Sequence, residues 1–163
     1  MPRVRRTREQ SLALVRQRLQ AYADRRVFSG FSEGRPVAGR HRFRFSWLGT
    51  EPLTLDYTPS SGTFVFRALL PNVPVRSRLF SDLDAFVAGR ASTRLPEHRR
   101  IDRRRARVRC VAARGALSLE LVATRNFHDY GVNRVVNLVH EVFLYLQEHR
   151  PEYLWTNFAA PEE

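Results

Sequence analysis

The segment from Asp129 to Arg150 constrains the fold most, because its apolar residues recur at steps of three and four. They are Val132, Val135, Val136, Val139, Val142, Phe143 and Leu146. That spacing places them in one stripe along an α-helix. Asp129 is predicted to cap the helix, and Pro151 is predicted to end it. The stripe has to be buried against another element, and the strands upstream are the obvious candidates.

Alternation of apolar and polar residues predicts two groups of strands. The first group covers residues 40–47, 53–57 and 63–70, which short turns join into an antiparallel meander. In its first strand His41, Phe43, Phe45 and Trp47 point one way, and Arg40, Arg42, Arg44 and Ser46 point the other. The third strand is apolar on both faces apart from Arg67, which predicts a central position.

The second group of strands is a hairpin, with Arg114-Gly115 as its turn. Its first strand, over 105–112, alternates between arginine and small apolar residues, and its second covers 117–122.

The remaining predicted segments are a helix over 7–26, a loop over 28–39, a helix over 81–90 and a tail, 152–163, that packs back on the body. Thr7 and Gln10 have the spacing of a capping box. Ser81 is predicted to cap the second helix, with Asp82 and Asp84 near its positive end.

The predicted order is helix, three strands, helix, two strands, helix. Runs of strands between helices are typical of an α+β fold with an antiparallel sheet. The 163 residues fit a single domain. We expect residues 1–6 to be a flexible basic N-terminus and residues 159–163 a flexible acidic tail.

The charge of the chain predicts an acidic partner. The net charge is +12, and all 28 basic residues are arginine. Such a field attracts nucleic acid, an anionic membrane or an acidic protein segment. No apolar run approaches the roughly 20 residues that span a bilayer, so we expect no membrane association. The single Cys110, with no secretory signal in the sequence, favours a cytoplasmic location.

The arginines concentrate in two rows. One comprises Arg40, Arg42 and Arg44, and the other comprises Arg99, Arg100, Arg103, Arg104, Arg105, Arg107 and Arg109. Guanidinium groups bind carboxylates and phosphates through two parallel hydrogen bonds. Arg105, Arg107 and Arg109 on one strand face would be about 6.5–7 Å apart, close to the phosphate spacing of one nucleic-acid strand. The alternative is a solvated face that protects a sheet edge from aggregation. The aromatic residues of the first strand point away from its arginines, which argues against base stacking there.

No motif for catalysis, metal or cofactor binding stands out. The five histidines lack the register of a metal site, and there is no glycine-rich phosphate loop. Asp82 and Asp84 are explained by capping, and Glu120 by cross-strand pairing with an arginine. Cys110 alternates with apolar residues and is interpreted as a small core residue. We expect a protein that is not an enzyme and has no cofactor.

The order of elements from Thr7 to Arg150 resembles the type III secretion chaperone-like fold, which includes the YbjN family of bacterial proteins. The resemblance implies a non-enzymatic homodimer that binds polypeptide segments of other proteins. Members of this group are often acidic, whereas this chain is strongly basic. The second apolar flank of the last helix, Leu138, Leu144 and Tyr145, is a candidate dimer contact; alternatively the first helix or the tail covers it. The first functional hypothesis is binding of an acidic polypeptide segment, and the alternative is binding of DNA or RNA through the arginine rows.

Overall fold

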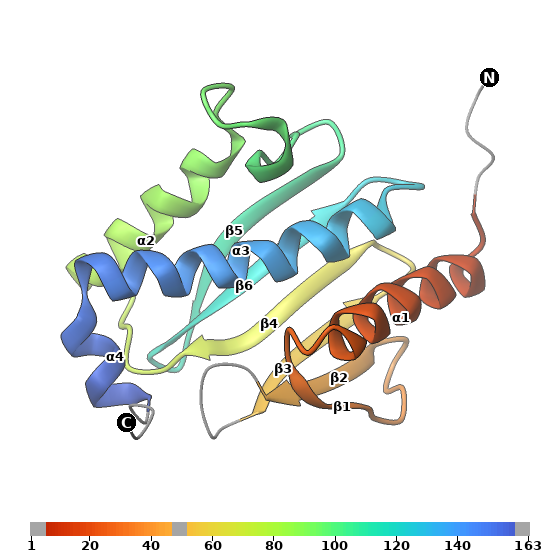
Figure 1. The fold of residues 1–163 in the computed structure, drawn as a ribbon, viewed down its shortest axis with the longest axis horizontal. Helices are drawn as coiled ribbons and strands as arrows, with labels where there is room; N and C mark the ends of the chain where they lie inside the picture. The colour runs from red at the N-terminus through yellow and green to blue at the C-terminus, as the bar shows by residue number, and fades with distance from the viewer. Residues whose placement is uncertain (1–5, 47–51, 159–163) are drawn as a thin grey trace.

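A computed structural model describes residues 6–46 and 52–158. They form a six-stranded antiparallel sheet with α1, α2 and α3 on one side of it (Figure 1). The strands are β1 (Ser29–Glu33), β2 (His41–Ser46), β3 (Pro52–Thr58), β4 (Thr63–Leu70), β5 (Ala106–Ala113) and β6 (Ala116–Ala123). The helices are α1 (Arg8–Asp24), α2 (Arg78–Ala88), α3 (His128–His149) and α4 (Pro151–Asn157), with short 3-10 turns η1 (Gly89–Ala91) and η2 (Glu97–Arg99). The predicted α+β class is confirmed. Of the ends predicted to be flexible, 1–6 and 159–163, residues 1–5 and 159–163 lie outside the described residues, as does Trp47; Arg6 is described and donates hydrogen bonds to Asn126 and Asp129.

The strand order is β1-β2-β3-β4-β6-β5, so the chain runs as a four-strand meander and then crosses to the far edge. α2 carries it from β4 to β5, and β6 returns between them. β4 is therefore central, as its two apolar faces predicted. The Arg114-Gly115 turn has φ of 54° and 76° at its two residues, the left-handed conformation that suits a two-residue hairpin.

The strand β1 was missed in the sequence, because residues 28–39 were predicted to be a loop. Ser32 pairs with Arg44, and Glu33 pairs with Phe43, in an antiparallel ladder with β2. Of the five residues of β1 only Phe31 is large and apolar, and Gly30 has a φ of 64°. Pairing with β2 creates this short, bulged edge strand, which has no alternating pattern of its own.

The core lies between the sheet and the helices. Its strand residues are Phe43, Phe45, Leu55, Tyr57, Phe64, Phe66, Leu117, Leu119 and Leu121, each 1% exposed or less. α1 adds Val15 and Leu19, and α2 adds Leu83 and Val87. These side chains come from alternate strand positions, since successive residues of a strand point to opposite faces.

α3 crosses the middle of the sheet and buries the whole predicted stripe. Gly131 permits its close approach: a Cβ there would lie 2.9 Å from the Cβ of Ala123 and 3.1 Å from the Phe64 ring. The predicted cap is wrong, because α3 begins at His128 and Asp129 lies in its first turn. Asp129 instead accepts a hydrogen bond from Arg6 at 3.1 Å. Among the described residues, no helix is both long and apolar enough to cross a membrane.

The other helix ends follow local capping chemistry. The capping box of Thr7 and Gln10 is present, although α1 ends at Asp24 rather than Arg26. α2 starts earlier than predicted, because Ser77, not Ser81, accepts the hydrogen bond of Phe80 N at 3.1 Å. Asp82 and Asp84 therefore lie inside α2, not at its start.

Pro151 ends α3 and also begins α4. Tyr153 of α4 is buried, and the Phe158 ring lies 5.3 Å from that of Phe143. The described part of the tail, through Phe158, thus packs back on the body as predicted. Trp155 does not, since it is 75% exposed.

Candidate interface for an acidic ligand

The face of the sheet opposite the helices, called the open face below, carries most of the strand arginines. Its residues are Arg40, Arg42, Arg44, Thr54, Asp56, Thr58, Thr63, Val65, Arg67, Ser118, Glu120, Val122, Arg107, Arg109 and Val111. Six of these are arginines and two are carboxylates, so the open face has a net charge of 6 − 2 = +4. The same alternation that points aromatic residues into the core thus concentrates charge on the other side.

The ladder pairs of the sheet define the layout of the open face. One continuous row runs Arg42, Asp56, Val65, Glu120, Arg109 across five neighbouring strands. Its arginines lie on β2 and β5, the first and last strands of this row, which are four strand spacings apart, or roughly 19 Å. Between them lie threonines, a serine and the valines Val65 and Val122, together with Arg67 of β4 and Glu120 of β6; Val122 is 39% exposed. The open face therefore has cationic margins on β2 and β5 and a centre where methyl groups lie beside one arginine and one carboxylate.

Asp56 anchors the margin on the β2 side. It is only 3% exposed and accepts two hydrogen bonds from Arg42, Nε to Oδ1 at 2.8 Å and Nη2 to Oδ2 at 3.0 Å. Arg67 from β4 also donates to Oδ2. Burial acts to raise the pKa of Asp56, but the hydrogen bonds and charges of the two arginines outweigh it and lower the pKa. The carboxylate is thus ionised, and it holds two guanidinium groups against the open face.

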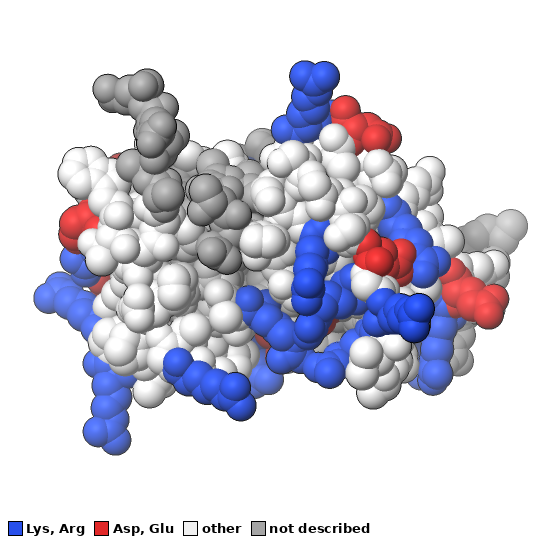
Figure 2. Space-filling model, turned by 90° about the horizontal axis from the view of Figure 1, so that it is seen from below, with Lys and Arg blue, Asp and Glu red and all other residues white. Residues whose placement is uncertain are grey.

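A hollow of about 390 Å³ lies beside this anchor. Arg40, Arg42, Arg44 and Asp56 line it, together with the end of β1, which includes Glu33, and the loop that follows. Viewed from below, at the side of β1 and β2, arginine side chains crowd this region with few acidic groups among them (Figure 2). Among the described residues Arg44 has no ion pair, so its guanidinium can bind an external anion.

The margin on the β5 side differs from the predicted row in one member. Arg107 and Arg109 lie on the open face, and Arg109 donates to Glu120 at 3.0 Å. Arg105 precedes β5, and its guanidinium lies 5.3 Å from the centre of the Tyr130 ring instead. The strand begins one residue later than the alternation suggested, because the chain at 102–105 turns over the start of α3. Arg107 has no ion pair among the described residues.

The rest of the predicted arginine row, 99–104, does not join the open face. Arg99 lies 3.7 Å from buried Glu141, and Arg100 donates to the carbonyl oxygens of Thr93 and Leu95. Arg103 and Arg104 are exposed in the turn before β5. The sequence grouped these residues by proximity along the chain, whereas the fold distributes them over two surfaces.

The predicted dimer flank is divided by the fold. Leu138 is 2% exposed, so it belongs to the core of its own chain and supplies no contact surface. Leu144 is 49% exposed. Tyr145 is half-buried, and its ring lies 4.6 Å from that of Phe86. The homodimer stays a prediction.

Cys110 and His128 take up structural positions. Cys110 is half-buried against the core, and burial together with the charge of Asp84 raises its pKa to about 12, which keeps the thiol protonated. His128 is buried and its Nδ1 lies 2.6 Å from the hydroxyl of Tyr57. Within 6–46 and 52–158, no three His, Cys, Asp or Glu side chains are grouped as metal ligands.

One polar cluster was missed in the sequence: the surroundings of Tyr130 and Arg134 at the start of α3. The two residues are four positions apart and lie outside the apolar stripe, and this spacing was the sequence signal that could have revealed the cluster.

Comparisons of the chain with protein-family models, curated proteins and solved structures gave no match.

Proposed function

We propose that this protein is a non-enzymatic binding protein that holds an acidic polypeptide segment on the open face. The observation that carries the proposal is the pairing of two arginine margins with a methyl-bearing centre on an uncovered sheet face. The order of elements resembles that of chaperone-like folds, which supports such a role. A homodimer and a cytoplasmic location belong to the same proposal.

The layout of the open face favours an amphipathic acidic helix. A helix with its side chains is about 10–12 Å across, which fits between margins roughly 19 Å apart. Its apolar stripe would rest on Val65 of β4 and Val122 of β6. Carboxylates on its two flanks would reach Arg44 on one side and Arg107 on the other, where charge-assisted hydrogen bonds are strong.

Nucleic acid is the second candidate, because the net charge of the open face attracts any polyanion. Single strands are bound on aromatic platforms that stack with bases. In the described strands the large aromatic side chains point into the core, and the centre of the open face offers valine and threonine instead. This difference favours a polypeptide over nucleic acid.

Fluorescence anisotropy at roughly 50 and 200 mM salt separates the two candidates. The probes are a labelled amphipathic acidic peptide, a scrambled peptide of the same composition, and single- and double-stranded oligonucleotides. We expect the amphipathic peptide to bind at least about tenfold tighter than the scrambled one, a difference of about 1.4 kcal/mol. Equal binding of both peptides would refute recognition of an apolar stripe. Oligonucleotides that bind more tightly than either peptide at both salt concentrations would establish the nucleic-acid alternative.

A further inference from the structure

We infer that a second anion site, separate from the open face, lies beside the first turns of α3 and takes a small ligand with a diphosphate group. A pocket of about 430 Å³ opens there between α3 and the segment 91–105. Small-molecule sites commonly have volumes of this order. The pocket lies on the helix side of the sheet, so the inference goes beyond the proposed function.

The composition of the pocket points to an anion. Five arginines line it, Arg100, Arg103, Arg104, Arg105 and Arg134, against two carboxylates, Glu97 and Asp102. The net charge of the lining is therefore 5 − 2 = +3. Like charges gathered in one concavity repel each other, and an anionic ligand relieves that repulsion.

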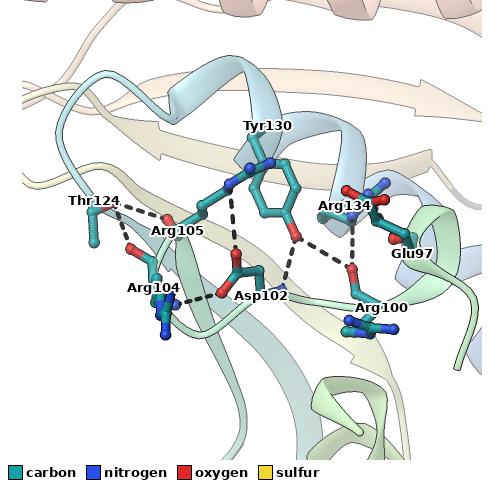
Figure 3. Close-up of polar contacts among 8 residues, drawn as sticks. All are labelled: Glu97, Arg100, Asp102, Arg104, Arg105, Thr124, Tyr130 and Arg134. Carbon is teal, nitrogen blue, oxygen red and sulfur yellow. Dashed lines mark hydrogen bonds and ion pairs between the residues drawn. The ribbon is translucent and has the colours of Figure 1, made fainter. Parts of the chain in front are cut away.

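A hydrogen-bond network fixes the wall of the pocket before any ligand arrives (Figure 3). The Tyr130 hydroxyl accepts from Asp102 N at 2.8 Å and donates to the carbonyl oxygen of Arg100 at 3.2 Å. The hydroxyl of Thr124 donates to the backbone carbonyl oxygens of Arg104 and Arg105, each at 3.2 Å. Such preorganisation lowers the entropy that binding costs.

Two guanidinium groups meet at the Tyr130 ring. Arg105 comes to the ring from the β5 side and Arg134 from α3, with guanidinium carbons 5.3 and 4.7 Å from the ring centre (Figure 3). Arg105 Nε lies 3.6 Å from Asp102 Oδ2. Arg134 donates from Nε and Nη2 to the carbonyl oxygens of Arg100 and Glu97. A guanidinium has five N–H donors, so both groups retain donors for a ligand.

The rim supplies a second pair of cations. The side chains of Arg103 and Arg104 are exposed and form no hydrogen bond or ion pair with other described residues. An inner pair at Tyr130 and an outer pair at the rim match two linked phosphate groups better than one. Because guanidinium groups already occupy the surroundings of the ring, recognition rests on the phosphates and not on stacking of an organic group.

Isothermal titration calorimetry at constant ionic strength tests the site, with inorganic pyrophosphate, orthophosphate and ADP as ligands. We expect saturable binding of pyrophosphate, at least about tenfold tighter than orthophosphate. We expect ADP to bind about as tightly as pyrophosphate, because recognition rests on the phosphates; ADP that binds much more tightly would keep the diphosphate site but overturn recognition by the phosphates alone. Both results support a diphosphate site. Binding of orthophosphate as tight as that of pyrophosphate, or no saturable binding, would overturn it.

Matched variants locate the site. Arg103→Gln together with Arg104→Gln removes two exposed groups that support no other described residue, so the fold is expected to persist. Pyrophosphate affinity should fall at least about tenfold, whereas acidic-peptide binding on the open face should not change. The control, Arg44→Gln with Arg107→Gln, should do the reverse. Equal pyrophosphate affinity in all three proteins would refute the site and leave the proposed function untouched.

Discussion

The two faces of the sheet are built by the same strands and differ in almost every physical respect. On the helix side, alternate residues such as Phe64 and Phe66 are fully buried. On the open face, their neighbours Val65 and Arg67 contact solvent. Most of the buried apolar surface that stabilises the fold therefore lies on the helix side. Side chains on the open face can contact a partner without a loss of core packing.

Among the described residues, each face has one buried carboxylate that arginines hold, and the faces differ in the cations left over. Glu141 of α3 is buried and accepts from Arg90 at 2.7 Å, as Asp56 on the open face accepts from Arg42 and Arg67. On the open face Arg44 and Arg107 stand without ion pairs among the described residues. Cations of a folded protein that are neither paired nor needed for folding are the ones available for binding.

The largest expected contrast comes from neighbouring residues on β4. Phe66→Ala should destabilise the protein by about 3–5 kcal/mol, because it opens a cavity in the core. Val65→Thr, one residue away on the open face, keeps the branched shape and should cost less than about 1 kcal/mol. Urea denaturation of both variants measures the difference. Similar losses of stability would mean that the two faces are packed alike.

A smaller contrast lies within the open face itself. Asp56→Asn removes the buried carboxylate that binds Arg42 and Arg67, and should cost about 1.5–3 kcal/mol, the range for hydrogen bonds to charged groups. Glu120→Gln breaks an exposed pair with Arg109 in the same row and should cost about 0–1 kcal/mol. Thermal unfolding of the two variants compares them. An Asp56 variant as stable as the Glu120 variant would contradict the anchoring role of Asp56.

The pH dependence of stability tests the buried pair under the helices. Burial and the charge of Arg6 lower the pKa of His128, although Asp129 acts to raise it. Burial raises the pKa of Tyr57, so its hydroxyl stays protonated, and it forms a hydrogen bond of 2.6 Å with Nδ1 of His128. The unfolded histidine takes up a proton near pH 6.5 and the folded one does so only at lower pH, so stability should fall as pH drops below about 6.5.

Urea denaturation at pH 7.5 and pH 5.5 measures this loss, with His128→Gln as the matched variant. The variant lacks the titrating group, so its stability should change less between the two pH values than that of the wild type. The other histidines contribute equally to both proteins and cancel in the comparison. Identical pH dependence in wild type and variant would show that His128 titrates normally in the fold.

Patterns within single elements were predictable from the sequence. The α3 stripe, the hairpin turn at Arg114-Gly115 and the Thr7 capping box depend on residues within a few positions of each other. α2 shows the limit of such reasoning: Ser77 and Ser81 both precede apolar residues, and only the packed helix selects Ser77 as the cap. The ends of elements depend on tertiary contacts more than their centres do.

Features made by contacts distant in sequence were not predictable. β1 exists because Ser32 and Glu33 pair with β2, and its own residues show no strand pattern. Arg105 does not lie on the open face, because its guanidinium group packs on the ring of Tyr130 of α3, which is 25 positions further along the chain. The open face could be predicted in part, since strand alternation grouped Arg40, Arg42 and Arg44, but its pairing with Arg67 and Arg107 required the strand order.

The central claim is that the arginine margins of the open face bind an acidic polypeptide, and charge reversal tests it most directly. Arg44→Glu with Arg107→Glu changes one unpaired cation on each margin, and Arg18→Glu with Arg78→Glu makes the same change in charge at exposed positions of α1 and α2. Stability should change by less than about 0.5 kcal/mol per substitution in both. Anisotropy titration with the amphipathic acidic peptide should show at least about tenfold weaker binding for the first variant and little change for the second. Equal losses in the two variants would mean that net charge alone attracts the peptide, and would contradict the account.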